Sequence, residues 1–187
     1  MTAAAHIPAG DVRAYVGMGS NLGDRAGNLL LGVRGMSNAG LRVARLSSVY
    51  ETEPVGVGDD EQPPYLNMVA ELVGAALPPP DELLARLLKI EYALGRRRTR
   101  PLAARTIDLD LLTYGDERRD TEFLILPHPR LHLRRFVLAP LAELAPAGTH
   151  PLLRQTYADL LAATADDSPV ALWKPRSSGR WPVVSAQ

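Results

Sequence analysis

Residues 105–115 read RTIDLDLLTYG, and polar and apolar side chains alternate from Ile107 to Leu111. Asp108 and Asp110 are separated by one leucine and flanked by aliphatic residues. Successive side chains of a β-strand point to opposite faces, so the segment predicts a strand with its aliphatic side chains in a core and both carboxylates on the other face. Two carboxylates about 7 Å apart on one face repel each other. We therefore expect a positively charged group beside them.

The segments on either side of this strand indicate the fold class. Toward the N-terminus the patterns predict a strand at 12–19, a helix at 20–40, a strand at 41–52, an exposed loop at 53–64, a strand at 65–75, a helix at 78–95 and a basic loop at 96–104. Toward the C-terminus they predict a short strand at 121–127, a loop at 128–135, a short helix at 136–146 and a helix at 156–166. The order β-α-β-β-α-β predicts an α+β fold with an antiparallel sheet and helices on one face.

Composition bounds the possible functions. The 187 residues contain 46% hydrophobic residues, enough for one core, so we expect a single domain over 1–187, with its core at about 12–165 and a loosely held tail at 166–187. Lys plus Arg and Asp plus Glu both number 21, which argues against a general binder of nucleic acid or membrane surfaces. Cysteine is absent, which excludes disulfides and thiolate catalysis. Neither a secretory signal nor an apolar span is visible, so we expect a cytoplasmic protein.

Asp108 and Asp110 admit two interpretations. Paired carboxylates on one face can hold magnesium ions that clamp a polyphosphate, or they can form ion pairs with nearby arginines. The preceding stretch contains a cluster of arginines, whose forked guanidinium groups match phosphate oxygens: Arg96, Arg97, Arg98, Arg100 and Arg105. This cluster in a chain of zero net charge favours a site for phosphate and metal.

Three further positions have both a structural and a functional interpretation. Glu91 lies within the apolar stripe of the predicted helix at 78–95, where a carboxylate is costly unless it is paired, so we expect it to hold a basic neighbour. His128 stands between two prolines and is either a structural turn residue or a site residue. The amide of Asn67 suits the polar edge of a heterocycle, but its aromatic neighbours fit core packing equally well.

The glycine-rich segment GMGSNLG at 17–23 has the spacing of a dinucleotide-binding turn only in part. Position 22 is Leu, and no acidic residue lies between Asp24 and Glu51 to hold a ribose. A tight turn followed by a helix cap explains the segment.

Six segments, taken together, resemble the 6-hydroxymethyl-7,8-dihydropterin pyrophosphokinases of folate biosynthesis. They are GMGSNLGD, SSVYETEPVG, PPYLNMVAEL, KIEYALGR, RTIDLDLL and LPHPRLHLRRFVLAPLAELAP, and they follow the family order over residues 12–146. The resemblance implies a ferredoxin-like βαββαβ core. It also implies magnesium-dependent transfer of the β,γ-pyrophosphoryl group of ATP to the hydroxymethyl group of the pterin, with release of AMP. The implied partners are ATP and the pterin, with no nucleic acid or membrane, and the implied state is a monomer.

The resemblance also implies roles for individual residues. The residues implied to be catalytic are Arg96, Arg105, Asp108 and Asp110, with the two aspartates holding two magnesium ions. The residues implied to bind ATP are Arg98, Arg105, His128 and Arg134, with Arg96, Arg98 and Arg105 in or beside a mobile loop that closes over the phosphates. The residues implied to bind the pterin are Thr52, Pro54, Val55, Tyr65, Asn67 and Phe136, with Tyr65 and Phe136 on its two faces.

The chain departs from the family pattern in the loop before Arg105. Residues 102–104 read LAA where members usually carry Trp-Gly-Pro, and Pro101 stands at an expected basic position. We expect slower closure or weaker ATP binding from these changes. The alternatives are a ferredoxin-like nucleotide- or pterin-binding protein with impaired catalysis, an RNA-binding module, and a two-metal phosphodiesterase. Magnesium-dependent release of AMP separates the pyrophosphokinase from all three.

Overall fold

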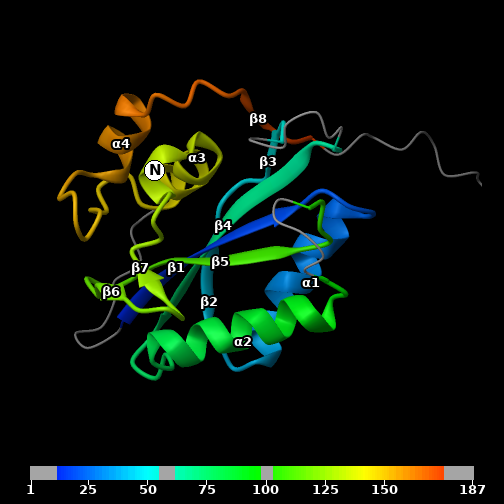
Figure 1. Cartoon of the computed structure of the whole chain (residues 1–187), viewed down its shortest axis with the longest axis horizontal. Coiled ribbons are helices and arrows are strands. Elements are labelled where there is room, and N and C mark those ends of the chain that lie inside the picture. The colour runs from blue at the N-terminus through cyan, green and yellow to red at the C-terminus, as the bar shows by residue number, and fades with distance from the viewer. Residues whose placement is uncertain (1–11, 55–61, 98–102, 175–187) are drawn as a thin grey trace, which may run out of the picture.

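The structure is a computed structural model that describes residues 12–54, 62–97 and 103–174. Its main sheet contains β1 (Val12–Ser20), β2 (Val43–Leu46), β3 (Tyr50–Thr52), β4 (Tyr65–Gly74), β5 (Asp108–Tyr114) and β8 (Val170–Leu172). The strand order is β5-β1-β4-β3-β8, and β2 also pairs with β4 (Figure 1). Each pairing is antiparallel. The predicted antiparallel βαββαβ core is confirmed.

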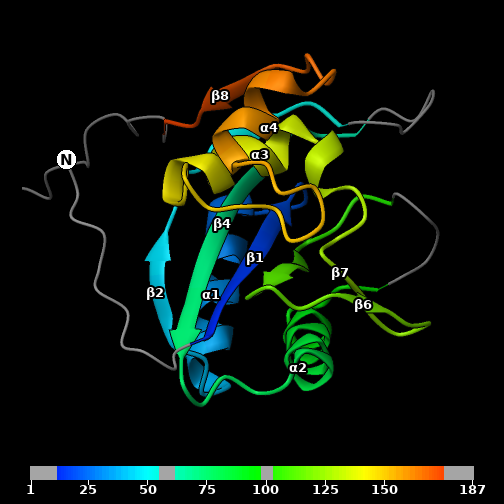
Figure 2. The same ribbon diagram turned by 90° about the vertical axis from the view of Figure 1, so that its left-hand side faces the viewer.

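Helices cover both faces of this sheet. Helices α1 (Arg25–Asn38) and α2 (Pro80–Ala93) lie along one face, as predicted, whereas α3 (Arg135–Leu144) and α4 (Tyr157–Ala163) cover part of the other face (Figure 2). The remaining elements are the short strands β6 (Arg119–Asp120) and β7 (Ile125–Leu126) and the 3₁₀ turn η1 (Leu131–Leu133). In the described residues, no helix is both long and apolar enough to cross a membrane.

Helix α2 forms for reasons that are visible in its sequence. Pro80 stands in the first turn, where the missing N–H is not needed, and two acidic residues follow it. Gly95 adopts φ +85° after the last turn and ends the helix. The stripe of Leu83 and Leu87 is fully buried against the sheet. This packing places the C-terminal end of α2 beside β5.

The predicted strand at 41–52 is two strands, β2 and β3, in the structure. Ser47 separates them: its N–H donates to Val69 O at 2.9 Å, and its hydroxyl accepts from Val69 N at 2.9 Å. Because the side chain takes the place of a backbone carbonyl, the regular ladder with β4 is interrupted. Strand β3 thereby becomes a separate short element.

Two boundaries also differ from the sequence expectation. Helix α1 begins at Arg25 rather than at residue 20, because Asp24 is its cap and Oδ1 of Asp24 accepts from Gly27 N at 3.0 Å. Residues 166–174 were expected to form part of a loosely held tail. In the structure Val170–Leu172 form β8 and pair with β3, and residues 175–187 lie outside the described part.

Candidate active site

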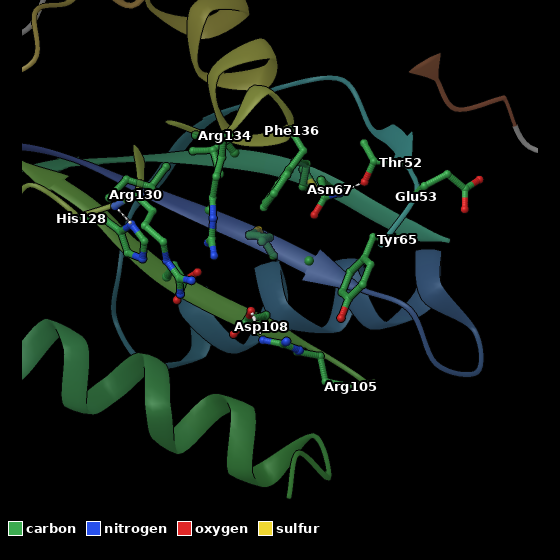
Figure 3. Close-up of a pocket in the computed structure, with 18 of the residues that line it drawn as sticks. Thr52, Glu53, Tyr65, Asn67, Arg105, Asp108, His128, Arg130, Arg134 and Phe136 are labelled. Atoms are coloured by element: carbon green, nitrogen blue, oxygen red, sulfur yellow. Dashed lines mark hydrogen bonds and ion pairs between the residues drawn. The ribbon is translucent and has the colours of Figure 1, made fainter. Parts of the chain in front are cut away.

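A cleft of about 480 Å³ opens on the sheet face that α3 covers only in part. It is lined by Gly17, Met18, Gly19, Thr52, Glu53, Tyr65, Asn67, Met68, Val69, Arg96, Arg105, Asp108, Asp110, Leu112, His128, Arg130, Arg134, Phe136 and Val137. These residues come from β1, β3 and the position after it, β4, the connection between α2 and β5, β5 itself, the turn before η1 and the start of α3. In Figure 3, His128 and Arg130 lie at one end of the cleft and Thr52 and Tyr65 at the other.

Asp108 is held by two of the predicted arginines. Arg105 Nη1 lies 2.6 Å from Asp108 Oδ2, and Arg96 Nη1 forms an ion pair with Asp108 Oδ1. The predicted alternation of β5 is confirmed, because Asp108 and Asp110 line the cleft while Leu109 is buried in the core on the other face. The resemblance implied that both arginines lie in or beside a closing loop. The structure places both arginines in the cleft wall, on either side of residues 98–102, which it does not describe.

Asp110 has a different environment. Within the described part of the chain, no side chain forms an ion pair with it. Burial, together with the negative charges of Asp108 and Glu91, raises the pKa of Asp110 to about 7. Arg134 and Arg96 act in the opposite direction, but they do not cancel this effect. A further positive charge in the cleft would therefore favour the ionised form of Asp110.

Glu91 is buried, as its place in the apolar stripe of α2 predicted, and it has the expected basic partner. Its Oε1 forms an ion pair with Arg96 Nη1 and accepts a hydrogen bond from Leu109 N at 2.7 Å. The carboxylate thus joins helix α2, strand β5 and a cleft arginine. A chain of contacts runs from Glu91 through Arg96 to Asp108.

The other end of the cleft is cationic and contains His128. Nδ1 of His128 accepts from Arg130 N at 3.2 Å, so in the neutral imidazole the proton lies on Nε2. Burial and the charges of Arg134 and Arg130 lower the pKa of His128 to about 4. Among the described residues, no carboxylate forms an ion pair with Arg130 or Arg134. This end can therefore accept an anion, to which a neutral His128 donates a hydrogen bond.

The opposite end combines aromatic rings with a fixed amide. Asn67 and Thr52 are both buried, and Asn67 Nδ2 donates to Thr52 Oγ1 at 2.7 Å. This bond leaves Asn67 Oδ1 as an acceptor on the cleft side, where a Cβ on Gly19 would lie only 3.0 Å from it. Tyr65 and Phe136 also line this region. The arrangement suits a flat ring with hydrogen-bonding edges.

Not all the predicted site residues can be placed. Arg98 and Val55 lie outside the described residues. Pro54 is described and half-buried, but it is not among the cleft-lining residues, whereas its neighbour Glu53 is.

The sequence did not indicate several residues of the cleft, among them three that line it and one that supports a lining arginine. Gly17 and Gly19 of β1 form part of the cleft floor, between β4 and β5. Their spacing of two residues along a predicted strand places both on one face, and this was the signal that could have indicated their role. Arg130 lines the cationic end of the cleft beside His128. Asn21 is buried, and its Oδ1 accepts from Arg105 N at 2.7 Å, which orients the chain at Arg105.

Fold and cleft together define a class: an α+β protein with a ferredoxin-like core, whose cleft joins paired carboxylates, cationic groups, and two aromatic rings beside a fixed amide. Residues 15–146 match the family model described as 7,8-dihydro-6-hydroxymethylpterin-pyrophosphokinase (HPPK). The chain belongs to this family. It is thus a transferase of folate biosynthesis that moves pyrophosphate from ATP to hydroxymethyldihydropterin.

Relatives and solved structures agree with this placement. The 2-amino-4-hydroxy-6-hydroxymethyldihydropteridine pyrophosphokinase of Bacillus subtilis (strain 168) is 41% identical over 88% of this chain and 92% of its own length. The protein of the same name from Synechocystis sp. is 40% identical over 79% of this chain and 74% of its own length. Wild-type HPPK-DHPS from Plasmodium falciparum matches with a TM-score of 0.60 at 16% identity, over 81% of this chain. This chain spans 43% of that longer one, and the likeness shows the ferredoxin-like fold.

Proposed function

We propose that the cleft is the catalytic site for pyrophosphoryl transfer, with ATP at its charged end and the pterin at its aromatic end. A single observation carries this proposal: one cleft contains the paired carboxylates, a cationic end without carboxylate partners, and a fixed amide beside two aromatic rings. The two ends match the two substrates that the family joins. The inferred reacting centre lies between them, near Asp108 and Asp110.

Asp108 and Asp110 fit two magnesium ions by their chemistry. Magnesium prefers carboxylate oxygens and usually takes only one or two from protein. The described residues contain no group of three or more His, Cys, Asp or Glu side chains that could hold a metal; Asp108 and Asp110 support the proposal because both line the cleft. The raised pKa of Asp110 indicates a carboxylate that a cation would stabilise. Bound there, magnesium would neutralise charge on phosphate oxygens.

The residues at the charged end bind the phosphates of ATP in this proposal. His128 donates its Nε2–H to a phosphate oxygen, and the guanidinium groups of Arg130 and Arg134 neutralise charge. Arg96 and Arg105 form ion pairs with Asp108. In this proposal they also contact the phosphates of ATP. Arg98 stays a predicted ATP ligand because the structure does not describe it.

At the aromatic end, Tyr65 and Phe136 contact the two faces of the pterin and Asn67 Oδ1 accepts from its polar edge. The Thr52–Asn67 hydrogen bond supports this assignment because it fixes which amide atom faces the cleft. The backbone around Thr52 completes the edge contact. Pro54 and Val55 stay predictions for this role.

Catalysis then consists of positioning and charge neutralisation. The hydroxymethyl oxygen of the pterin forms a bond to the β-phosphorus of ATP, and the bond from that phosphorus to the oxygen of AMP breaks. The hydroxyl proton goes to solvent. The cleft arginines stabilise the negative charge that develops on AMP. No covalent intermediate with the protein is needed.

The nucleotide product tests the proposal. We expect AMP when the pure protein is mixed with ATP, magnesium and 6-hydroxymethyl-7,8-dihydropterin, and no AMP when the pterin or the magnesium is left out. Formation of ADP would contradict pyrophosphoryl transfer. Pterin binding without any nucleotide product would favour the alternative, a binding protein with impaired catalysis.

Replacing Arg130 by alanine tests the charged end. We expect the KM for ATP to rise about tenfold, the effect of losing one hydrogen bond to a charged group, while the KM for the pterin stays within about twofold. The pKa of His128 should also rise, because one of the charges that lower it is gone. Steady-state kinetics and NMR titration of the imidazole measure the two effects. Arg34→Ala, an exposed site on α1, is the matched control.

A monomer, a cytoplasmic location and a single domain over the whole chain also belong to this proposal.

A further inference from the structure

Glu143, near the end of α3, accepts four hydrogen bonds from the segment that leads into β3. Ser48 N lies 3.0 and 3.1 Å from its two carboxylate oxygens, and Ser48 Oγ lies 2.9 Å from Oε1. Tyr50 Oη donates to Oε2 at 2.9 Å. Hydrogen bonds to an ionised acceptor are stronger than those between neutral groups. The carboxylate is therefore a tether between helix α3 and strand β3.

The two elements joined by this tether carry opposite sides of the aromatic end of the cleft. Phe136 lies in the first turn of α3, seven residues and about two turns before Glu143, so both side chains leave the same side of the helix. Thr52 follows Tyr50 by two residues on β3, so these two side chains also share a face. One pair, Glu143 and Tyr50, is bonded. The other pair, Phe136 and Thr52, borders the cleft (Figure 3).

Within the described residues, the one other ion pair or side-chain hydrogen bond between β3 and a helix joins Glu51 to Arg25 of α1 at 2.7 Å, so it does not tie β3 to α3. Strand β3 is three residues long and lies between β4 and β8, with Thr52 opposite Tyr65 and Val170. These ladder bonds run within the plane of the sheet. They hold β3 beside its neighbours but do not determine its position relative to α3, which packs above the sheet. The Glu143 tether crosses between the two layers.

Tyr50 is suited to this contact. Burial and the hydrogen bond to Glu143 raise the pKa of Tyr50 to about 12, so the phenol stays protonated and donates across the physiological range. The tether therefore keeps its phenol donor across this range.

We propose that Glu143 is a positioning residue for the pterin side of the cleft, holding β3 with Thr52 at a set separation from Phe136. The inference rests on the proposed function, since it takes this end of the cleft as the pterin subsite. Glu143 does not line the cleft and does not touch the substrates. It acts through the bonded Thr52–Asn67 pair, which contacts the polar edge of the ring, and through Phe136, which contacts one face, because their separation determines whether both contacts can form together.

Kinetics of Glu143→Ala test this role. We expect the KM for 6-hydroxymethyl-7,8-dihydropterin to rise about tenfold, the effect of losing bonds to one charged group, while the KM for ATP stays within about twofold. Glu143→Gln keeps an acceptor for Ser48 and should recover part of the effect. Tyr50→Phe removes only the phenol bond and should shift the same KM in the same direction by a smaller factor. Glu82→Ala, an exposed glutamate on α2, is the control and should change neither KM.

Three results would overturn the inference: an unchanged pterin KM in Glu143→Ala, an equal rise in both KM values, or a rise that Glu143→Gln does not reduce. If Glu143→Ala does not fold, the ratio of the two KM values in Tyr50→Phe decides. Failure of the proposed function itself would appear differently, as absence of pterin-dependent AMP in the wild-type protein.

Discussion

Asp110→Asn is expected to lower kcat by roughly 10³-fold or more while the folded protein becomes at least as stable as the wild type. The loss of turnover follows from removing one of two carboxylates proposed to hold the metal at the reacting phosphate, a group of electrostatic importance in the transition state. The equal or higher stability follows because burial and the negative charges of Asp108 and Glu91 disfavour an ionised carboxylate at position 110. Asparagine keeps the shape and removes the repulsion.

The stability part has a definite dependence on pH. In the folded protein the pKa of Asp110 is raised to about 7, above its unfolded value. The folded state of the wild type therefore binds more protons, and its Asp110 contribution is lost as pH rises through about 7. Asparagine does not titrate. In buffer with a chelator, the free energy of unfolding of Asp110→Asn relative to wild type should thus increase from pH 4 to pH 8.

Pterin-dependent AMP formation and chemical denaturation measure both effects. Asp116→Asn, an exposed position just after β5, makes the same chemical change outside the cleft and should alter neither quantity. Near-normal turnover in Asp110→Asn would remove the basis for the two-metal assignment.

The second large effect is expected at Glu91. Glu91→Ala leaves the guanidinium of Arg96, 11% exposed, without its buried partner and leaves Leu109 N without an acceptor. Breaking a buried ion pair on one side costs about 3–5 kcal/mol, so we expect the free energy of unfolding to fall by about that amount. We also expect kcat to fall about 10²-fold, because Arg96 no longer holds its position at Asp108.

Denaturant titration and AMP formation test this pair of effects. Glu82→Ala is the matched control, since Glu82 lies on the same helix and pairs with Arg86 at an exposed site. That change should cost only about 0.3–0.5 kcal/mol. Glu91→Gln keeps an acceptor for Leu109 N and should lie between the two. A Glu91→Ala variant as stable as Glu82→Ala would show that the buried chain from Glu91 to Asp108 contributes little.

The sequence predicted some features of the candidate site and left others open. The alternation in β5 predicted that both aspartates share a face, and the apolar stripe of α2 predicted a buried, paired Glu91; the structure bears out both. The sequence left open whether arginines or a cation neutralise the aspartates. In the structure Arg96 and Arg105 bind Asp108, while Asp110 stays without an ion pair among the described residues.

Other features depend on contacts between distant segments. Arg130 is one of several arginines in sequence, and only its place beside His128 in the cleft gives it a role. Residues 41–52 form two strands instead of one because Ser47 bonds to Val69. Residues 170–172 form strand β8 because they pair with β3. None of these pairings leaves a periodic trace in the chain, so local pattern could not reveal them.

The sequence by itself determined the class of fold, the order of its core elements and the face on which Asp108 and Asp110 lie. It could do so because helix and strand periods report burial locally, residue by residue. Only the tertiary structure decided which arginines bind Asp108, how Gly17 and Gly19 open the cleft floor, and that Glu143 joins α3 to β3. Most of those features arise from side chains that are far apart in sequence, and even Arg105, three residues from Asp108, shares that carboxylate with an arginine that the packing of α2 beside β5 brings to it. Which partners meet is therefore decided only when the layers pack.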